Sequence, residues 1–176
     1  GIGPDENIRF VVELLAVSRN RTYCRAPQPL PDAGVDGKPN AVDLPVESPT
    51  EIVIEDIEDG SGDAVEVGTW VSIEYVGVSC ASGAEFDASF NRGSTFDFTV
   101  GQGAIEGMTE GVIGAKKGGI RRIEMPSHSG YGPQGSPPDI APDDPLVFYV
   151  EIVDVKDSAP VTTLPPDAVP TPDDTV

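Results

Sequence analysis

The sequence predicts an α+β domain in which a curved β-sheet packs over one short α-helix. Two observations support this fold class. Helical spacing and helix-ending residues coincide in a single segment, residues 101–119, whereas the segments around it are rich in β-branched and aromatic residues. A short amphipathic helix among several strands must bury its apolar side against a sheet that bends over it. The expected strands are residues 69–78, 94–100, 120–125 and 146–155.

The helix is predicted from the spacing of its apolar residues. These recur at steps of three and four: Ile105, Met108, Val112 and Ala115. Such spacing places them on one side of a helix. Gly118 and Gly119 are expected to end this helix, with Lys116 and Lys117 in its last turn.

The strand pattern begins before the helix. Ile52, Ile54 and Ile57 precede a Gly-Ser-Gly-Asp turn and should open the folded unit. In the next strand, alternation predicts that Val71, Ile73 and Tyr75 face the core and that Trp70, Ser72 and Glu74 face outward. Ser82 and Gly83 are expected to form the tip of a hairpin.

Composition divides the rest of the chain. Residues 18–50 contain regularly placed prolines and no apolar periodicity, which predicts a Pro-rich, extended linker. Residues 51–156 form the folded domain, and residues 157–176 are expected to be a disordered acidic, Pro-rich tail. Residues 1–17 match the segment ending at Val155 at an offset of 138, with Ile2, Pro4, Asp5, Phe10, Val12, Glu13 and Val17 repeated. We therefore expect residues 1–17 to be the C-terminal strand of a preceding domain of the same kind.

Charge and composition exclude several classes of function. A formal net charge of −19 argues against nucleic acid and anionic membranes as partners. No apolar run approaches the roughly 20 residues that a membrane span needs. Because the chain begins without Met or a signal-peptide pattern, we expect a processed product or an excerpt, with any targeting segment outside it.

The cysteines and the histidine offer little to a metal ion. Cys24 and Cys80 have no CxxC partner and His128 is the only histidine, so no metal site and no cofactor are expected. The two cysteines either form a disulfide or remain separate thiols, and the sequence favours neither alternative. A catalytic triad would depend on His128, which lies in a Ser- and Gly-rich loop and is better interpreted as solvated.

What remains is a set of apolar residues on the strands and loops around the helix. They are Tyr75, Phe86, Phe96, Phe98, Ile105, Met108, Tyr131, Ile140 and Phe148. Such a set fits a small hydrophobic pocket with few polar groups. The alternative is that these residues simply form the core.

At this point the chain resembles a known family. The motifs are VSIEYVG, EFDASF, FDFTVGQGAIEGMTEGVIGAKKGGIRRIEMP, GYG and IAPDDPLVFYVEIVDV. In order and spacing they are similar to an FKBP-type peptidyl-prolyl cis-trans isomerase domain from about Glu51 to Val155. The resemblance implies a curved antiparallel β-sheet wrapped around one short α-helix. It also implies that residues 1–17 end a second such domain, so that the whole protein has a tandem-domain form.

The resemblance also implies a site. The residues expected to act in catalysis are Tyr75, Asp87, Ile105 and Tyr131. Those expected to bind the substrate are Phe86, Phe96, Ala104, Met108, Ile140 and Phe148. Two positions depart from the family pattern: Met108 stands where a tryptophan usually forms the floor, and Asp139 stands where an aliphatic residue is common. The floor should persist because Met is apolar and adaptable.

The function implied by the resemblance is acceleration of X-Pro bond rotation in proline-containing protein or peptide clients. Catalysis would be non-covalent, and a macrolide is a further expected ligand. The Pro-rich segment, the acidic tail and the cysteines favour an extracytoplasmic location. The alternative, suggested by Met108, is a non-catalytic FKBP-like module that binds peptides or acts as a chaperone.

Overall fold

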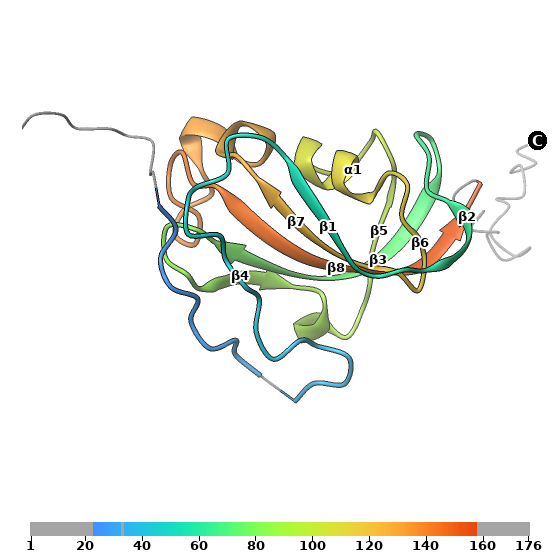
Figure 1. Ribbon diagram of the computed structural model, residues 1–176, viewed down its shortest axis with the longest axis horizontal. Helices are drawn as coiled ribbons and strands as arrows, with labels where there is room; N and C mark the ends of the chain where they lie inside the picture. The colour runs from blue at the N-terminus through green and yellow to red at the C-terminus, as the bar shows by residue number, and fades with distance from the viewer. Residues whose placement is uncertain (1–22, 33, 158–176) are drawn as a thin grey trace, which may run out of the picture.

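The computed structural model describes residues 23–32 and 34–157, and most of their strands join one antiparallel sheet (Figure 1). The strand order is β1-β7-β8-β3-β4, and β5 pairs with β3 beside this path, while β2 and β6 form a separate pair. The strands are β1 (Val53–Glu58), β2 (Ser61–Ala64), β3 (Trp70–Ser79), β4 (Glu85–Ala88), β5 (Phe96–Thr99), β6 (Lys116–Lys117), β7 (Ile120–Met125) and β8 (Leu146–Lys156). One short helix, α1 (Glu106–Val112), completes the predicted architecture, which is thereby confirmed.

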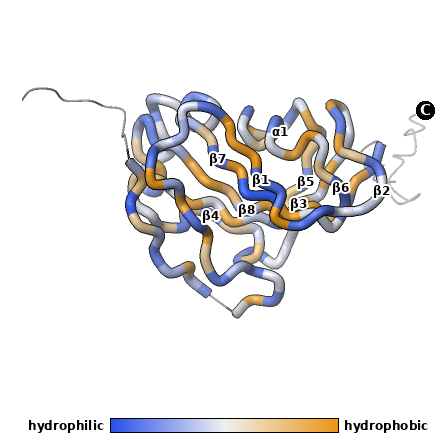
Figure 2. The backbone as a smooth tube through the Cα atoms, viewed as in Figure 1, coloured by the Kyte–Doolittle hydropathy of each residue, from blue (hydrophilic) through white to orange (hydrophobic). Residues whose placement is uncertain are grey.

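The face of the sheet that α1 covers, which we call the helix face, carries the larger core. Alternate residues of β3, β7 and β8 point there, because successive side chains of a strand face opposite sides. The buried set includes Val71, Ile73, Tyr75, Ile123, Met125, Phe148, Val150 and Ile152. Figure 2 shows hydrophobic residues interspersed with hydrophilic ones along these strands. The alternation predicted for Val71, Ile73 and Tyr75 is confirmed.

Helix α1 packs closely on β7 because two of its residues lack a side chain. Gly107 and Gly111 are one turn apart and both are buried. A Cβ atom at Gly107 would overlap the side chain of Met125, and one at Gly111 would overlap that of Ile123. These glycines therefore set the distance between the helix and the sheet.

The helix ends earlier than the sequence suggested. Backbone geometry becomes extended at Ile113, where ψ is 133°, and Gly114 follows with φ of +80°. The Arg121 guanidinium donates hydrogen bonds to the carbonyl groups of Gly111 (2.9 Å) and Ile113 (2.6 Å) and so satisfies carbonyls that the helix leaves free. The prediction that Lys116 and Lys117 occupy the last turn is wrong, since they form β6.

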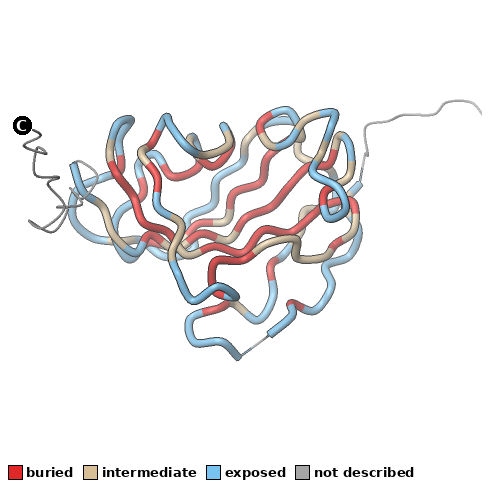
Figure 3. Tube along the Cα trace, turned by 180° about the vertical axis from the view of Figure 1, so that it is seen from behind, coloured by how far each residue is buried: buried red, intermediate tan, exposed pale blue. Residues whose placement is uncertain are grey.

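The opposite face of the sheet is covered by residues 23–32 and 34–50, which we call the strap. This segment contains turns at residues 31–32 and 34–37 and no helix among its described residues, and it packs on the domain rather than standing apart from it (Figures 1 and 3). Leu30 and Val42 of the strap are 6% and 3% exposed and contact a second cluster that contains Val76, Val78 and Val147. We call this side of the sheet the strap face.

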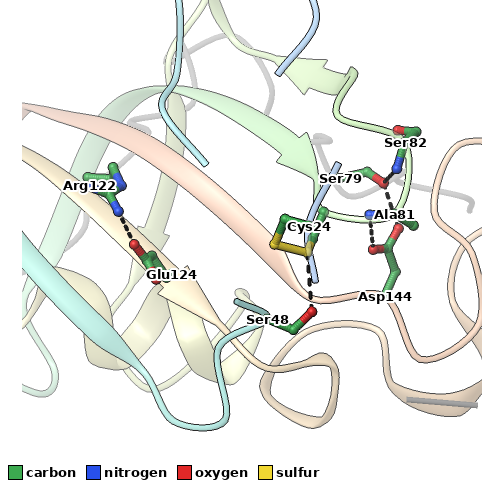
Figure 4. Close-up of a disulfide and its surroundings, with 9 residues drawn as sticks. Cys24, Ser48, Ser79, Ala81, Ser82, Arg122, Glu124 and Asp144 are labelled. Atoms are coloured by element: carbon green, nitrogen blue, oxygen red, sulfur yellow. Dashed lines mark hydrogen bonds and ion pairs between the residues drawn. A yellow bond between two sulfur atoms is a disulfide. The ribbon is translucent and has the colours of Figure 1, made fainter. Parts of the chain in front are cut away.

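A disulfide fixes the beginning of the strap. Cys24 and Cys80 are bonded, with their Cα atoms 4.5 Å apart, which decides between the two alternatives left by the sequence. The strap then follows the β3–β4 turn, where the amide of Arg25 donates to the carbonyl of Cys80 (2.9 Å) and that of Gln28 to Gly83 (2.7 Å). Figure 4 shows the neighbouring carboxylate of Asp144 bound to this same turn.

A buried ion pair holds the middle of the strap. Lys38 Nζ lies 2.9 Å from Glu85 Oε2, with side chains 0% and 4% exposed. The same ammonium group donates to the carbonyl of Pro31 (2.8 Å) and to Asn91 Oδ1 (2.7 Å). The Asn91 amide in turn donates to Glu85 Oε1 (2.7 Å), so strap and sheet share one polar network.

Other predictions meet the structure only in part. Trp70 points away from the helix face, as the alternation predicts, but it is buried at 9% exposure with Lys156 Nζ 4.7 Å from its ring centroid. Residues 1–17 and 158–176 lie outside the described residues, so the predicted strand and tail there stay predictions. Among the described residues, no helix has the length and apolar character needed to cross a membrane.

Candidate functional site

A hollow of about 450 Å³ opens on the helix face beside α1. Strands β3, β4, β5 and β8, helix α1 and the loops beside them contribute the wall residues. The lining residues are Tyr75, Phe86, Asp87, Phe96, Gly103, Ala104, Ile105, Met108, Tyr131 and Phe148. The structure thus brings together nine of the ten predicted site residues.

The floor and walls are mainly apolar. Met108 of α1 is 3% exposed and forms the base of the hollow beneath the aromatic rings. Tyr75 and Phe96 meet edge to face with centroids 6.1 Å apart, and Phe86 and Phe148 do so at 5.5 Å. These edge-to-face contacts hold the rings in fixed orientations, so the wall is preformed.

Gly77 provides the space that two of these rings occupy. It lies on β3 directly opposite Phe148 of β8. A Cβ atom there would lie 2.5 Å from the Phe86 ring and 2.9 Å from the Phe148 ring, closer than such atoms approach. The sequence analysis did not identify Gly77; the signal was an isolated glycine inside a strand, which marks a close approach.

One wall of the hollow is polar. The Tyr75 hydroxyl donates a hydrogen bond to Asp87, and Arg92 forms an ion pair with the same carboxylate. Arg92 also donates to the Tyr75 hydroxyl oxygen at 3.0 Å. Burial, together with the hydrogen bond to Asp87, raises the pKa of Tyr75 to about 12.

Arg92 is the second residue that the sequence analysis missed. It lies at the end of a short 3-10 helix, Phe90–Arg92, which folds the chain back toward Asp87. The available signal was an arginine five positions after Asp87, with Gly93 able to adopt the left-handed conformation that ends the turn. Without Arg92 the Asp87 carboxylate would lack a counter-charge at the hollow.

Two hydrogen-bond donors at the hollow have no acceptor within the described chain. Ile105 has extended backbone just before α1, and its carbonyl accepts from the amides of Met108 (3.1 Å) and Thr109 (3.0 Å), but its own N–H is unpaired there. The Tyr131 hydroxyl likewise has no partner in residues 23–32 and 34–157, and its side chain is 40% exposed. Burial, and secondarily the charge of Asp87, raise the pKa of Tyr131, so the hydroxyl remains a donor at neutral pH.

Ile140 is the one predicted site residue that does not line the hollow. It is 3% exposed and instead contributes to a neighbouring hollow of about 200 Å³, together with Ser136 and Asp139. His128 is exposed and lines neither space. Within the described residues no group of His, Cys, Asp and Glu side chains is arranged to hold a metal ion.

The chain is similar to known proteins across this domain. A sequence model of the family described as "FKBP-type peptidyl-prolyl cis-trans isomerase" matches residues 62–153. The "FK506-binding protein" of Streptomyces anulatus is 43% identical over 117 residues, which cover 65% of this chain and 94% of that protein. "Peptidyl-prolyl cis-trans isomerase FPR2" of Saccharomyces cerevisiae is 43% identical over 93 residues, or 52% of this chain and 69% of the relative.

A relative with a solved structure has the same fold. The "FKBP-type peptidyl-prolyl cis-trans isomerase FkpA" of Escherichia coli strain K12 is 39% identical over 121 residues, covering 69% of this chain and 43% of FkpA. The crystal structure of FkpA superimposes with a TM-score of 0.55 at 39% identity and covers 60% of this chain and 48% of that one. The chain therefore spans less than half the length of FkpA.

Proposed function

The chain belongs to the family of FKBP-type peptidyl-prolyl cis-trans isomerases, and on this premise we propose that the hollow beside α1 is its active site. The predicted activity, isomerisation of the peptide bond before proline, is confirmed by the family to which the chain belongs. One observation above all supports this site. Two unpaired donors, the Ile105 amide and the Tyr131 hydroxyl, converge on an apolar hollow of about 450 Å³.

The reaction needs no nucleophile. Rotation about an X-Pro bond faces a barrier of roughly 20 kcal/mol because the resonance of the amide must be broken. No bond to a heavy atom forms and no proton has to leave the substrate. An active site can therefore act by holding the flanking peptide and by favouring the twisted amide over the planar one.

Each predicted residue then has a role. The prolyl ring rests on Met108 between the aromatic walls, and Phe86, Phe96, Phe148 and Ala104 exclude water from it. The Ile105 amide and the Tyr131 hydroxyl donate to client carbonyls on either side of the ring. Holding the two flanking groups fixes the peptide in a conformation from which only the X-Pro bond turns.

The polar wall positions one of the rings. The Arg92 guanidinium neutralises the charge of Asp87, and the Asp87 carboxylate accepts a hydrogen bond from the Tyr75 hydroxyl. These contacts hold the Tyr75 ring edge to face against Phe96. In this arrangement Asp87 acts by positioning and by its dipole with Arg92, not by proton transfer. Ile140 supports the loop of Tyr131 from the core.

The apolar floor distinguishes this proposal from the non-catalytic alternative. Met108 is buried and fills the base of the hollow without closing it. Methionine is apolar and flexible, so it can contact a prolyl ring at the position where tryptophan is usual in the family. We expect Met108→Trp to keep or raise kcat/KM in a protease-free isomerisation assay. Undetectable isomerisation by both the wild type and this variant would instead favour a binding module.

A matched pair of tyrosine variants tests the site. We expect Tyr131→Phe to lower kcat/KM by about two- to twelvefold, the effect of losing one hydrogen bond of about 0.5–1.5 kcal/mol, with little change in the free energy of unfolding. Tyr149→Phe removes the same hydroxyl from β8 on the strap face and should leave kcat/KM unchanged. Equal activity losses in the two variants would contradict the assignment.

The setting of the enzyme is also a proposal. The Cys24–Cys80 disulfide supports an extracytoplasmic location, since disulfides persist in oxidising compartments. The match of residues 1–17 to the end of the domain supports a tandem form of the whole protein. Relatives named "FK506-binding protein" support macrolide binding in the same hollow, and a thermal shift on addition of FK506 tests it.

A further inference from the structure

A second, smaller hollow adjoins the proposed active site. It has a volume of about 200 Å³ and shares Phe86, Asp87 and Tyr131 with the larger one, while Ser136, Asp139 and Ile140 complete it. Because three wall residues are common to both, a peptide whose proline occupies the larger hollow can extend over the smaller one. A side chain next to the proline can therefore enter it.

The loop that carries Asp139 is anchored. The amide of Ser136 donates to the carbonyl of Ile140 (2.9 Å), and the amide of Ile140 donates back to the carbonyl of Ser136 (3.0 Å). Ile140 is 3% exposed and belongs to the main core, whereas Asp139, its neighbour, is exposed. The carboxylate of Asp139 is thus presented at the rim of the small hollow by a turn that is fixed at both ends.

The charge of Asp139 is uncompensated. Of the two carboxylates that line the small hollow, Asp87 is paired with Arg92 and Tyr75. Asp139 has no ion pair or hydrogen bond within the described chain, and residues 126–145 contain no lysine or arginine. The small hollow therefore combines apolar walls with one free negative charge at its rim.

We propose that Asp139 determines specificity by favouring clients with a lysine or arginine next to the isomerised proline. The inference rests on the proposed function, because the small hollow is a subsite only when the larger one holds the proline. A long cationic side chain suits the space, since its methylene groups can lie on Phe86 and Ile140 while its charge reaches the rim. An exposed pair of this kind is worth about two- to fivefold in affinity and weakens with salt.

The test compares peptides that differ only in one charge. Isomerisation of Ala-Xaa-Pro-Phe and of Ala-Ala-Pro-Xaa, with Xaa as Lys, Glu or Ala, is followed without a protease by NMR exchange at low and high salt. For one of the two positions we expect a higher kcat/KM with Lys than with Glu, by at least about threefold at low salt. Asp139→Asn should remove most of this ratio, and so should high salt.

Asp143→Asn is the matched control. It removes the same charge from the same loop, but Asp143 does not line the small hollow, and asparagine tolerates its φ of +56°. We expect its Lys-to-Glu ratio to equal that of the wild type. Equal changes in both variants, or no charge preference at either position while the Ala peptides turn over normally, would overturn the inference alone. Failure to turn over any peptide would overturn the assignment of the active site and this inference with it.

Discussion

The two faces of the central sheet are both apolar, but they are covered in different ways. On the helix face α1 spans only Glu106–Val112, and the aromatic rings beside it enclose a hollow instead of filling it. On the strap face, Leu30 and Val42 pack against the strands, a disulfide fixes one end, and a buried ion pair fixes the middle. The same sheet therefore supports a binding surface on one side and a closed interface on the other.

The difference also appears in how polar groups are satisfied. The Lys38 ammonium on the strap face has three partners. The Asp144 carboxylate accepts hydrogen bonds from Ser79 and Ala81 at the β3–β4 turn. On the helix face the Ile105 amide and the Tyr131 hydroxyl remain unpaired within the described chain. Because these two donors border the hollow, they remain available to bind a ligand there. The strap face should thus contribute to stability without affecting activity, whereas the residues around the hollow on the helix face should determine activity.

The largest expected effect on the free energy of unfolding comes from breaking the buried ion pair between the strap and the sheet. Lys38→Ala leaves the Glu85 carboxylate buried without a counter-charge, which should lower the free energy of unfolding by about 3–5 kcal/mol in urea titrations. A Lys38→Met, Glu85→Gln double variant should recover much of this loss because no charge then remains buried.

A surface ion pair provides the control for that experiment. Lys117 pairs with Asp154 at 2.8 Å, but the lysine side chain is 60% exposed. Lys117→Ala should therefore cost less than about 1 kcal/mol. If Lys38→Ala cost no more than this variant, the strap would not be an integral part of the domain.

Removing the disulfide should have the next largest effect. Replacing Cys24 and Cys80 by alanine frees a cross-link between residues 56 positions apart, and we expect the free energy of unfolding to fall by about 2–4 kcal/mol. The folded variant should retain its kcat/KM, since neither cysteine lines the hollow. A large loss of activity with no change in the free energy of unfolding would contradict the assignment of the disulfide to stability and not to catalysis.

The last expected effect is that of pH on the helix face. The hydroxyl of Tyr75 is protonated in the folded protein up to its raised pKa of about 12, whereas the unfolded chain loses that proton near 10. The free energy of unfolding should consequently fall as pH rises from 10 toward 12, and Tyr75→Phe should lessen that fall.

Catalysis should not sense this titration at ordinary pH. The raised pKa values of Tyr75 and Tyr131 keep both hydroxyls protonated, and the exposed His128 lies outside the hollow. We expect kcat/KM to vary by less than about twofold between about pH 6 and 9. A steep inflection in this range would imply a proton transfer that the proposed mechanism lacks.

Much of this arrangement follows from local patterns in the sequence. The alternation of Val71, Ile73 and Tyr75 identified the core side of β3, and the spacing of Met108 and Val112 identified the buried side of α1. These predictions succeeded because the period of a strand or helix determines which side chains share a face. The length of α1 could not be predicted in this way, because Arg121, distant in sequence from Gly111, binds the carbonyls at its end.

The site divides in the same manner. Its apolar lining was predicted from the family motifs, and the structure places nine of the ten residues around one hollow. Arg92 and Gly77 were not predicted, since one acts through Asp87 and the other through the absence of a side chain beneath Phe86. Neither role leaves a periodic signal in the sequence.

By itself the sequence determined the fold class, the core side of β3 and the buried side of α1. These features depend on residue type and on the spacing of residues that are close together in the sequence. Only the tertiary structure decided that the Pro-rich strap covers the second face, that Cys24 bonds to Cys80, and that Lys38 is buried against Glu85. The disulfide and the ion pair join residues more than forty positions apart, and such contacts follow from how the whole sheet bends rather than from any local pattern.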